Sequence, residues 1–310
     1  MRPFRTLALG ASLLVLLSAC TTGGGSTNKP TIKVGSDGFN ESQVVAEMYA
    51  QVLEAAGYTV ARNLGLGARS VTAPALESGQ IDLKPEYIGS GTAFYDPTKT
   101  SPDSAATAAA LQAILATRGG GITVLDFSPG EDFDAFAVRQ DTADSLGLSK
   151  MSDLAAVQDE LVWGYPPECE TNALCRGALE NTYGINWPPK EVRQLAACDA
   201  PIAEALNGGA VDIAELCSTQ AAIAQFGFVV LDDDKGTNPA QNLAPLVRDD
   251  FLAKLSESDR TAFEKLLNEV SAKLTTEALQ EINIALNVDQ KDVPDAAKEF
   301  LQANGLLPSS

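Results

Sequence analysis

The sequence predicts an α/β protein built from two similar lobes. Short apolar strands alternate with amphipathic helices along most of the chain, a pattern typical of α/β folds with a largely parallel sheet. The segment 75–83 is also echoed 130 residues later at 205–213, and each copy reads as a helix that ends at glycine before a strand carrying an aspartate. Because ligands bind at the carboxyl ends of strands in such sheets, two facing lobes would place both strand ends in one cleft.

The elements follow from the spacing of apolar residues in chain order. Strands are expected at 31–34, 58–62, 81–83, 122–125 and 136–138, and helices at 41–56, 71–77 and 104–117. From 249 to 303 the pattern predicts helices only, including 259–274 and 276–286, packed on the outside of a lobe. A polar turn is expected after each echoed strand, at 85–90 and 215–220, where Tyr87 corresponds to Cys217.

The N-terminus has the layout of an export signal. Arg2 and Arg5 precede an apolar run at 7–17 that is too short to span a bilayer comfortably. The sequence Leu17-Ser18-Ala19-Cys20 then resembles a bacterial lipobox, which predicts a lipoprotein signal peptide at 1–19 and lipidation of Cys20. An ordinary signal peptide cut near Ala19 is the alternative. Residues 20–29 are rich in Thr, Gly and Ser and predict a flexible tether, so the body is expected outside the cytoplasmic membrane on a lipid anchor.

The composition argues against several classes of function. The chain has 22 Lys and Arg against 41 Asp and Glu, a net charge of −19, so a nucleic acid partner is not expected. It contains no histidine, which removes the commonest general base and nearly all catalytic zinc chemistry. We therefore expect a binding protein rather than an enzyme, without a cofactor.

Four cysteines follow Cys20. An even number in an oxidising compartment predicts two disulfides, for which three pairings are possible. Cys169 and Cys175 lie in a proline-rich turn and can close a small loop, which leaves Cys198 with Cys217. A metal site is the alternative, but the irregular spacing and the oxidising compartment argue against it, so no metal is expected.

Several motifs occur in one order along the chain. Val34-Gly35-Ser36-Asp37-Gly38-Phe39-Asn40-Glu41-Ser42-Gln43 is followed by Ala46-Glu47-Met48-Tyr49, Leu66-Gly67-Ala68-Arg69, Pro85-Glu86-Tyr87, Ala135-Phe136-Ala137-Val138, Pro166-Pro167-Glu168-Cys169 and Leu231-Asp232-Asp233-Asp234-Lys235. Together they resemble the glycine betaine/choline (quaternary-amine) solute-binding proteins of ABC importers. The resemblance covers nearly all of the chain after the signal.

The resemblance implies a type II periplasmic-binding-protein fold, in which two α/β lobes are joined by two crossover strands and a ligand lies in the cleft between them. The crossovers are expected near 134–136 and 234–242. Lobe 1 would then comprise 30–134 and 238–308, and lobe 2 would comprise 135–237. The implied role is to bind a compatible solute such as glycine betaine, choline or carnitine and to deliver it, as a monomer, to the permease and ATPase subunits of an importer.

In this chain, the residues that match the family's ligand site differ from the family pattern. A quaternary ammonium donates no hydrogen bond, so the family surrounds it with about four tyrosines whose faces attract the cation. Tyr87 keeps its tyrosine, whereas the other positions match Asp134, Cys217 and either Ala240 or Gln241. A disulfide at Cys217 would line the cleft where a tyrosine usually stands.

Other residues could compensate for the lost rings. Asp132 and Asp134 would attract a cation, and Phe39 either adds an aromatic face or packs beneath the first helix. Arg69 either clamps a ligand carboxylate or is solvated, and Asp37 is either a ligand group or a turn former. The candidate ligand-binding residues are Ser36, Asp37, Phe39, Arg69, Tyr87, Ser90, Asp132, Asp134, Cys217 and Gln241.

The altered cage leaves three functions open. The first is binding of an osmoprotectant for import, and the second is the same role for a different small polar or aromatic ligand. The third is a sensor or structural lipoprotein whose cleft is not used for transport.

Overall fold

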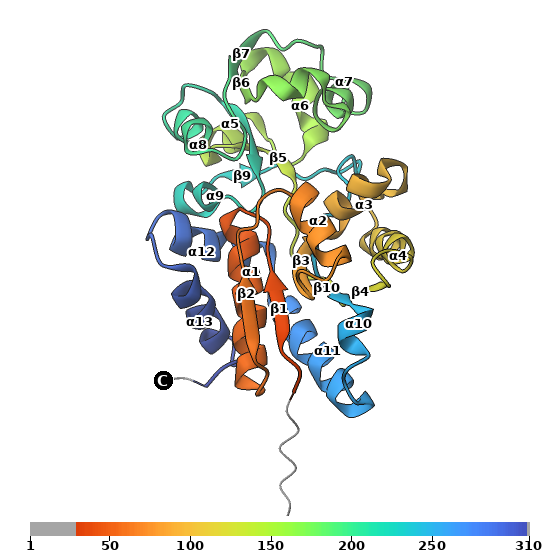
Figure 1. The fold of residues 1–310 in the computed structure, drawn as a ribbon. Coiled ribbons are helices and arrows are strands. Elements are labelled where there is room, and N and C mark those ends of the chain that lie inside the picture. The colour runs from red at the N-terminus through yellow and green to blue at the C-terminus, as the bar shows by residue number, and fades with distance from the viewer. Residues whose placement is uncertain (1–28, 309–310) are drawn as a thin grey trace, which may run out of the picture.

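A computed structural model describes residues 29–308, which form two lobes, each around a five-stranded sheet (Figure 1). The sheet of lobe 1 has the order β2-β1-β3-β10-β4 and that of lobe 2 the order β7-β6-β8-β5-β9. The strands of lobe 1 are β1 (Ile32–Gly35), β2 (Val60–Asn63), β3 (Leu83–Tyr87), β4 (Ile122–Val124) and β10 (Leu243–Arg248). The strands of lobe 2 are β5 (Asp134–Val138), β6 (Val162–Tyr165), β7 (Glu191–Gln194), β8 (Ile213–Cys217) and β9 (Val229–Val230).

Helices cover both sheets. Those of lobe 1 are α1 (Asn40–Ala55), α2 (Arg69–Glu77), α3 (Ile88–Tyr95), α4 (Ser104–Leu115), α10 (Asp249–Leu252), α11 (Glu257–Ser271), α12 (Thr276–Asn287) and α13 (Val293–Ala303). Those of lobe 2 are α5 (Gln140–Leu146), α6 (Leu154–Val157), α7 (Ala178–Asn181), α8 (Ala200–Asn207) and α9 (Ala221–Phe226). No helix within 29–308 is long and apolar enough to cross a membrane.

The internal echo is confirmed as a repeat of topology. β3 and β8 are offset by 130 residues along their whole length, as are β1 and β6, and the two pairs occupy the same places in their sheets. The expected turn at 85–90 was wrong, because β3 begins at Leu83 and continues through Tyr87. β8 likewise contains Glu215. Glu86 is buried in β3, where Arg69 and Lys84 pair with it, and Glu215 is buried in β8.

The sheets are mixed, not largely parallel as expected. In each sheet the first three strands are parallel, but β10 runs antiparallel to β3 and β4, and β5 runs antiparallel to β8 and β9. β5 and β10 follow the two segments that cross between the lobes, so they enter their sheets from the opposite end. The expected boundary at 237/238 falls within the second of these segments, whereas that at 134/135 falls inside β5, just after its first residue.

The C-terminal helices were correctly predicted. α11, α12 and α13 pack against α1 and bury the main core of lobe 1. The side chain of Ser256 caps α11 by accepting from Asp259 N, and that of Thr275 caps α12 by accepting from Ala278 N. α12 also contacts α9 of lobe 2, and Asn283 Nδ2 donates to Thr219 O at 2.9 Å. This flank of lobe 1 therefore reaches across to lobe 2.

The structure joins Cys169 to Cys175 and Cys198 to Cys217, the pairing expected from the sequence. Both groups of residues that could approach a metal contain one of these disulfides, so their sulfurs offer no thiolate. The predicted signal peptide, the lipidated Cys20 and most of the tether lie outside the described residues. Lys29, the last tether residue, donates to Ala56 O at 2.8 Å and lies over the ring of Tyr58.

Candidate functional site

A cavity of about 280 Å³ lies where the two lobes and the crossing segments meet. We call it the cleft cavity. It is lined by Phe39, Arg69, Tyr87, Ser90, Asp132, Phe133, Asp134, Leu174, Cys217, Asn238, Pro239 and Gln241. Its volume lies near the lower end of the range of about 300–1,000 Å³ found for small-molecule sites. All of the sequence candidates line it except Ser36 and Asp37.

Aromatic rings form one wall of the cleft cavity. Tyr87 ends β3, and Phe39 immediately precedes α1. Their rings are stacked, with centroids 6.3 Å apart and an interplanar angle of 19°. Phe39 is 45% exposed, so it is not a packing residue beneath α1. The hydroxyl of Tyr87 is buried without a hydrogen-bond partner among the described residues, which leaves it available to a ligand.

Phe133 adds a third ring that the sequence interpretation missed. It stands between Asp132 and Asp134, the two acids that were singled out. That position just before a crossover strand was the available signal, because a residue there faces the space between the lobes.

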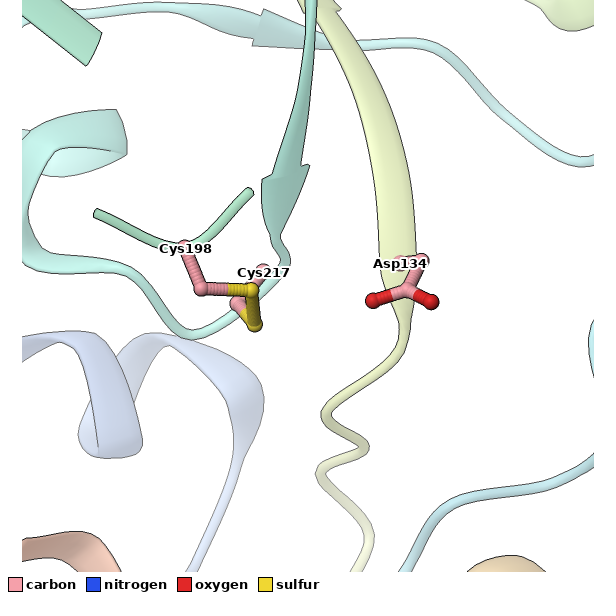
Figure 2. Close-up of side chains that lie close together, drawn as sticks. All are labelled: Asp134, Cys198 and Cys217. Carbon is pink, nitrogen blue, oxygen red and sulfur yellow. A yellow bond between two sulfur atoms is a disulfide. The ribbon is translucent and has the colours of Figure 1, made fainter. Parts of the chain in front are cut away.

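A carboxylate and a disulfide lie side by side at the positions where the sequence analysis expected aromatic rings. Asp134 and Cys217 are opposite each other in the antiparallel pair β5 and β8. A carboxylate oxygen of Asp134 lies within 4.8 Å of the sulfurs of Cys198 and Cys217, and Figure 2 shows the carboxylate beside the disulfide. Burial raises the pKa of Asp134.

Asp132 adds a second acid to this wall. Burial raises the pKa of its carboxyl, and the nearby charge of Asp134 adds to the effect, although hydrogen bonds from Thr219 oppose it. Thr219 N donates to Asp132 Oδ1 at 3.2 Å, which fixes this acid of the crossing segment to lobe 2.

Arg69 lies at the N-terminus of α2 and is held by an ion pair. Its Nε and Nη2 donate to Glu86 at 2.8–3.1 Å, while Nη1 has no hydrogen-bond partner within 29–308. Burial lowers the pKa of Arg69, but the charge and hydrogen bonds of Glu86 raise it by more, so the guanidinium stays charged. Arg69 is therefore not a freely solvated side chain, and Nη1 can still reach a ligand carboxylate.

A buried ionic network supports both Arg69 and Tyr87. Lys84 is 1% exposed and donates to Glu86 Oε2 at 3.1 Å and to Asp37 Oδ1 at 2.9 Å. Burial raises the pKa of Glu86, but the charges of Lys84 and Arg69 lower it by more. Because Glu86 Oε1 also accepts from Tyr87 N at 2.9 Å, one carboxylate positions two residues of the cleft cavity.

Ser36 and Asp37 belong to the support rather than to the wall. Both are buried in lobe 1. Asp37 accepts from Lys84 and from Thr72, and Ser36 Oγ accepts from Gly65 N at 2.8 Å. Side-chain oxygens that were expected to contact a ligand therefore accept hydrogen bonds within lobe 1. These bonds also shape the loop that carries Phe39.

Ser90 and Gln241 pair with each other on the cavity wall. Gln241 Oε1 accepts from Ser90 N at 3.0 Å, and the side chains of the two residues are also in hydrogen-bonding contact at 3.0–3.1 Å. The sequence matched either Ala240 or Gln241 to a tyrosine of the family pattern, and Gln241 is the one of the two that lines the cavity.

Two lobes of like topology with a small cavity between them define a substrate-binding protein of the type II fold. The family model described as the substrate binding domain of the ABC-type glycine betaine transport system matches residues 30–303. The chain belongs to this family.

Characterised relatives agree with this assignment. The chain is 27% identical to the glycine-betaine-binding protein of Pseudomonas aeruginosa over 95% of this chain and 94% of that protein. It is 28% identical to the carnitine transport binding protein OpuCC of Listeria monocytogenes, over 97% and 95% of the two chains. The solved structure of apo YehZ from Escherichia coli matches 89% of this chain and 99% of its own, with a TM-score of 0.78 and 25% identity.

The chain is thus the substrate-binding component of a glycine betaine/carnitine-type ABC transporter. Its family consists of extracytoplasmic proteins that bind small molecules and work with permease components, and it is a transport family, not an enzyme family.

Proposed function

We propose that this protein is a lipid-anchored binding protein that captures a compatible solute such as glycine betaine, choline or carnitine in the cleft cavity and delivers it to an ABC permease. The observation that carries the proposal is the pairing of an aromatic wall with an acidic wall in one small cavity. Phe39 and Tyr87 form the first wall, and Asp132 and Asp134 form the second.

These groups suit a quaternary ammonium ion. Each aromatic face contributes about 0.5–2 kcal/mol to holding a cation, and the carboxylates attract it without needing a hydrogen-bond donor. Nη1 of Arg69 offers a charge-assisted hydrogen bond to the carboxylate of a betaine or of carnitine. Choline lacks that carboxylate, so we expect it to bind more weakly than glycine betaine.

The proposal includes the anchor at Cys20 and a tether that ends where Lys29 meets lobe 1. A monomer held in this way has a raised effective concentration at the permease. Mass spectrometry of the mature N-terminus, with membrane fractionation of a Cys20→Ala variant, tests the anchor. A soluble wild-type protein with an unmodified cysteine would remove this part of the proposal.

A second candidate is the same transport role for a different small polar or aromatic compound. A carboxylate, a disulfide and an amide stand where the family pattern expects rings, which favours a ligand with more polar groups. An ergothioneine transport permease/ergothioneine binding protein of Helicobacter pylori is also 23% identical over 90% of this chain, which spans 48% of that protein.

Calorimetric titration with glycine betaine, choline and carnitine tests the first candidate. Tyr87→Ala should abolish binding, and Phe39→Ala should weaken it about 2- to 30-fold through loss of one face. Phe94→Ala is the matched control, because Phe94 is 44% exposed and does not line the cleft cavity. Absence of binding to all three solutes would reject the first candidate in favour of the second.

A further inference from the structure

A second and larger cavity adjoins the cleft cavity. It has a volume of about 660 Å³, and residues of α1 and α12 of lobe 1 and of α8 and α9 of lobe 2 line it. We call it the side chamber. It shares Phe39, Asp132 and Cys217 with the cleft cavity, so the two spaces meet along that wall. Its volume suits a small organic molecule.

The side chamber combines apolar surface with negative charge. Phe39, Phe226 and Val288 line it and are 36–45% exposed. Its acidic residues are Glu41, Asp132, Asp199 and Glu204, and its described lining residues include no Lys or Arg. An apolar cation is the ligand type that both properties favour.

Glu41 provides a buried hydrogen-bond acceptor at the side chamber. The residue is 5% exposed, and its Oε2 accepts from Asn283 Nδ2 at 2.6 Å. Its Oε1 is buried without a hydrogen-bond partner among the described residues, and the same is true of Gln220 Oε1 on the lobe 2 side. Buried polar atoms without partners are costly, so two such acceptors on residues that line one chamber favour a ligand that donates hydrogen bonds.

We propose that the side chamber is a second binding subsite, which takes a protonated aliphatic amine with its ammonium at Glu41 and Gln220 and its alkyl stem against Phe226 and Val288. This subsite goes beyond the proposed function. A quaternary ammonium donates no hydrogen bond and therefore leaves both acceptors without a partner, whereas a primary ammonium has three N–H donors.

Two probes that differ only in their donors test the subsite on the wild-type protein. n-Butylammonium and n-butyltrimethylammonium carry the same stem and charge, but only the first donates hydrogen bonds. Calorimetric titration should show n-butylammonium binding at least about tenfold more tightly, the scale of a charge-assisted hydrogen bond. Equal affinities, tighter binding of the quaternary probe, or no binding of n-butylammonium would overturn the proposal.

Substitutions of the lining residues then show where n-butylammonium binds. Glu41→Gln should weaken n-butylammonium binding at least about tenfold, because it removes the charge that holds the ammonium. Phe226→Ala should weaken it severalfold, and because Phe226 is 36% exposed this variant should fold normally. Phe94→Ala is the matched control that leaves the side chamber intact, since Phe94 is 44% exposed and lines neither cavity. Unchanged affinity in both chamber variants would place the probe elsewhere.

The pH dependence gives an independent readout. Burial and, after it, the nearby charge of Asp132 raise the pKa of Glu41 to about 8. Asp199 and Glu204 are the other titratable groups that line the side chamber. Because Glu41 must lose its proton to pair with an ammonium, n-butylammonium affinity should rise about tenfold per pH unit from pH 6 to pH 8. A flat profile in the wild-type protein would contradict this role of Glu41.

The subsite and the proposed cleft ligand can each be refuted without refuting the other. Binding of glycine betaine without binding of n-butylammonium removes the subsite alone. Binding of n-butylammonium without any response to glycine betaine, choline or carnitine removes the proposed cleft ligand alone.

Discussion

Replacing Glu215 by glutamine should make the protein more stable at alkaline pH. Glu215 lies in β8 and is 3% exposed. Burial, together with the charges of Asp134 and Glu168, raises the pKa of its carboxyl to about 8. Its Oε2 lies 3.1 Å from the disulfide sulfur of Cys175, which carries no hydrogen and therefore cannot donate to a carboxylate.

The direction and the magnitude of this pH dependence of folding stability follow from proton linkage. A carboxyl with a raised pKa binds more protons in the folded state, so folding stability falls as pH rises between the unfolded value of 4.5 and about 8. The loss is about 1.4 kcal/mol per pH unit. It amounts to about 3 kcal/mol at pH 7 and at most about 5 kcal/mol at pH 9. Glu215→Gln does not titrate and should escape this loss.

Urea denaturation of the wild-type protein and the variant at pH 5, 7 and 9 measures the difference. The advantage of Glu215→Gln over the wild type should grow steadily with pH. Glu191→Gln on β7 is the control, because it removes the same charge from an exposed position of the same lobe. Parallel pH profiles for the wild-type protein and Glu215→Gln would refute the assignment of a raised pKa.

Two further outcomes concern stability. Lys84→Met should lower the free energy of unfolding by about 3–5 kcal/mol, because it leaves the buried carboxylate of Asp37 without its cation; Lys33→Met, whose side chain is 40% exposed, should cost less than about 1 kcal/mol. Urea melts of the two variants compare them, and equal losses would contradict the role of the network. The double variant Cys198→Ser/Cys217→Ser should lose about 3 kcal/mol for a loop of this size, measured in the same way. Peptide mapping without reduction should show both disulfides, and a free Cys217 thiol would contradict the pairing.

The repeat was readable from the sequence because equivalent strands kept a constant spacing. The echo between 75–83 and 205–213 indicated that the two lobes share a topology. The family motifs indicated that Tyr87, Arg69 and Asp134 lie at one cavity. The mixed direction of the sheets was not readable. Apolar periodicity did not identify β10 as a strand, and it does not reveal that a strand enters a sheet from the other lobe.

Polar residues were misread where their partners are distant in the sequence. Glu86 suggested a turn because polar runs usually mark turns, whereas the structure buries it in β3, where it pairs with Arg69 and Lys84. Glu41 in the first turn of α1 fits the usual preference of helix N-termini for acids. Its unusual environment depends on Asn283, which lies 242 residues away in α12. No local pattern contains that information.

The strand ends show how the binding chemistry has changed. Tyr87 and Cys217 end the equivalent strands β3 and β8, so one lobe keeps its ring while a disulfide beside Asp134 replaces the other. Cation capture then depends on carboxyls as well as rings, and burial raises the pKa of Asp132 and of Asp134. Because a protonated carboxyl no longer attracts a cation, we expect glycine betaine affinity to fall as pH drops from neutral toward these raised values. Titrations across that range in wild type and Asp134→Asn would show it, since the variant should bind more weakly at neutral pH and respond less to acid. An affinity in the wild-type protein that does not change with pH would mean that the rings alone hold the ligand.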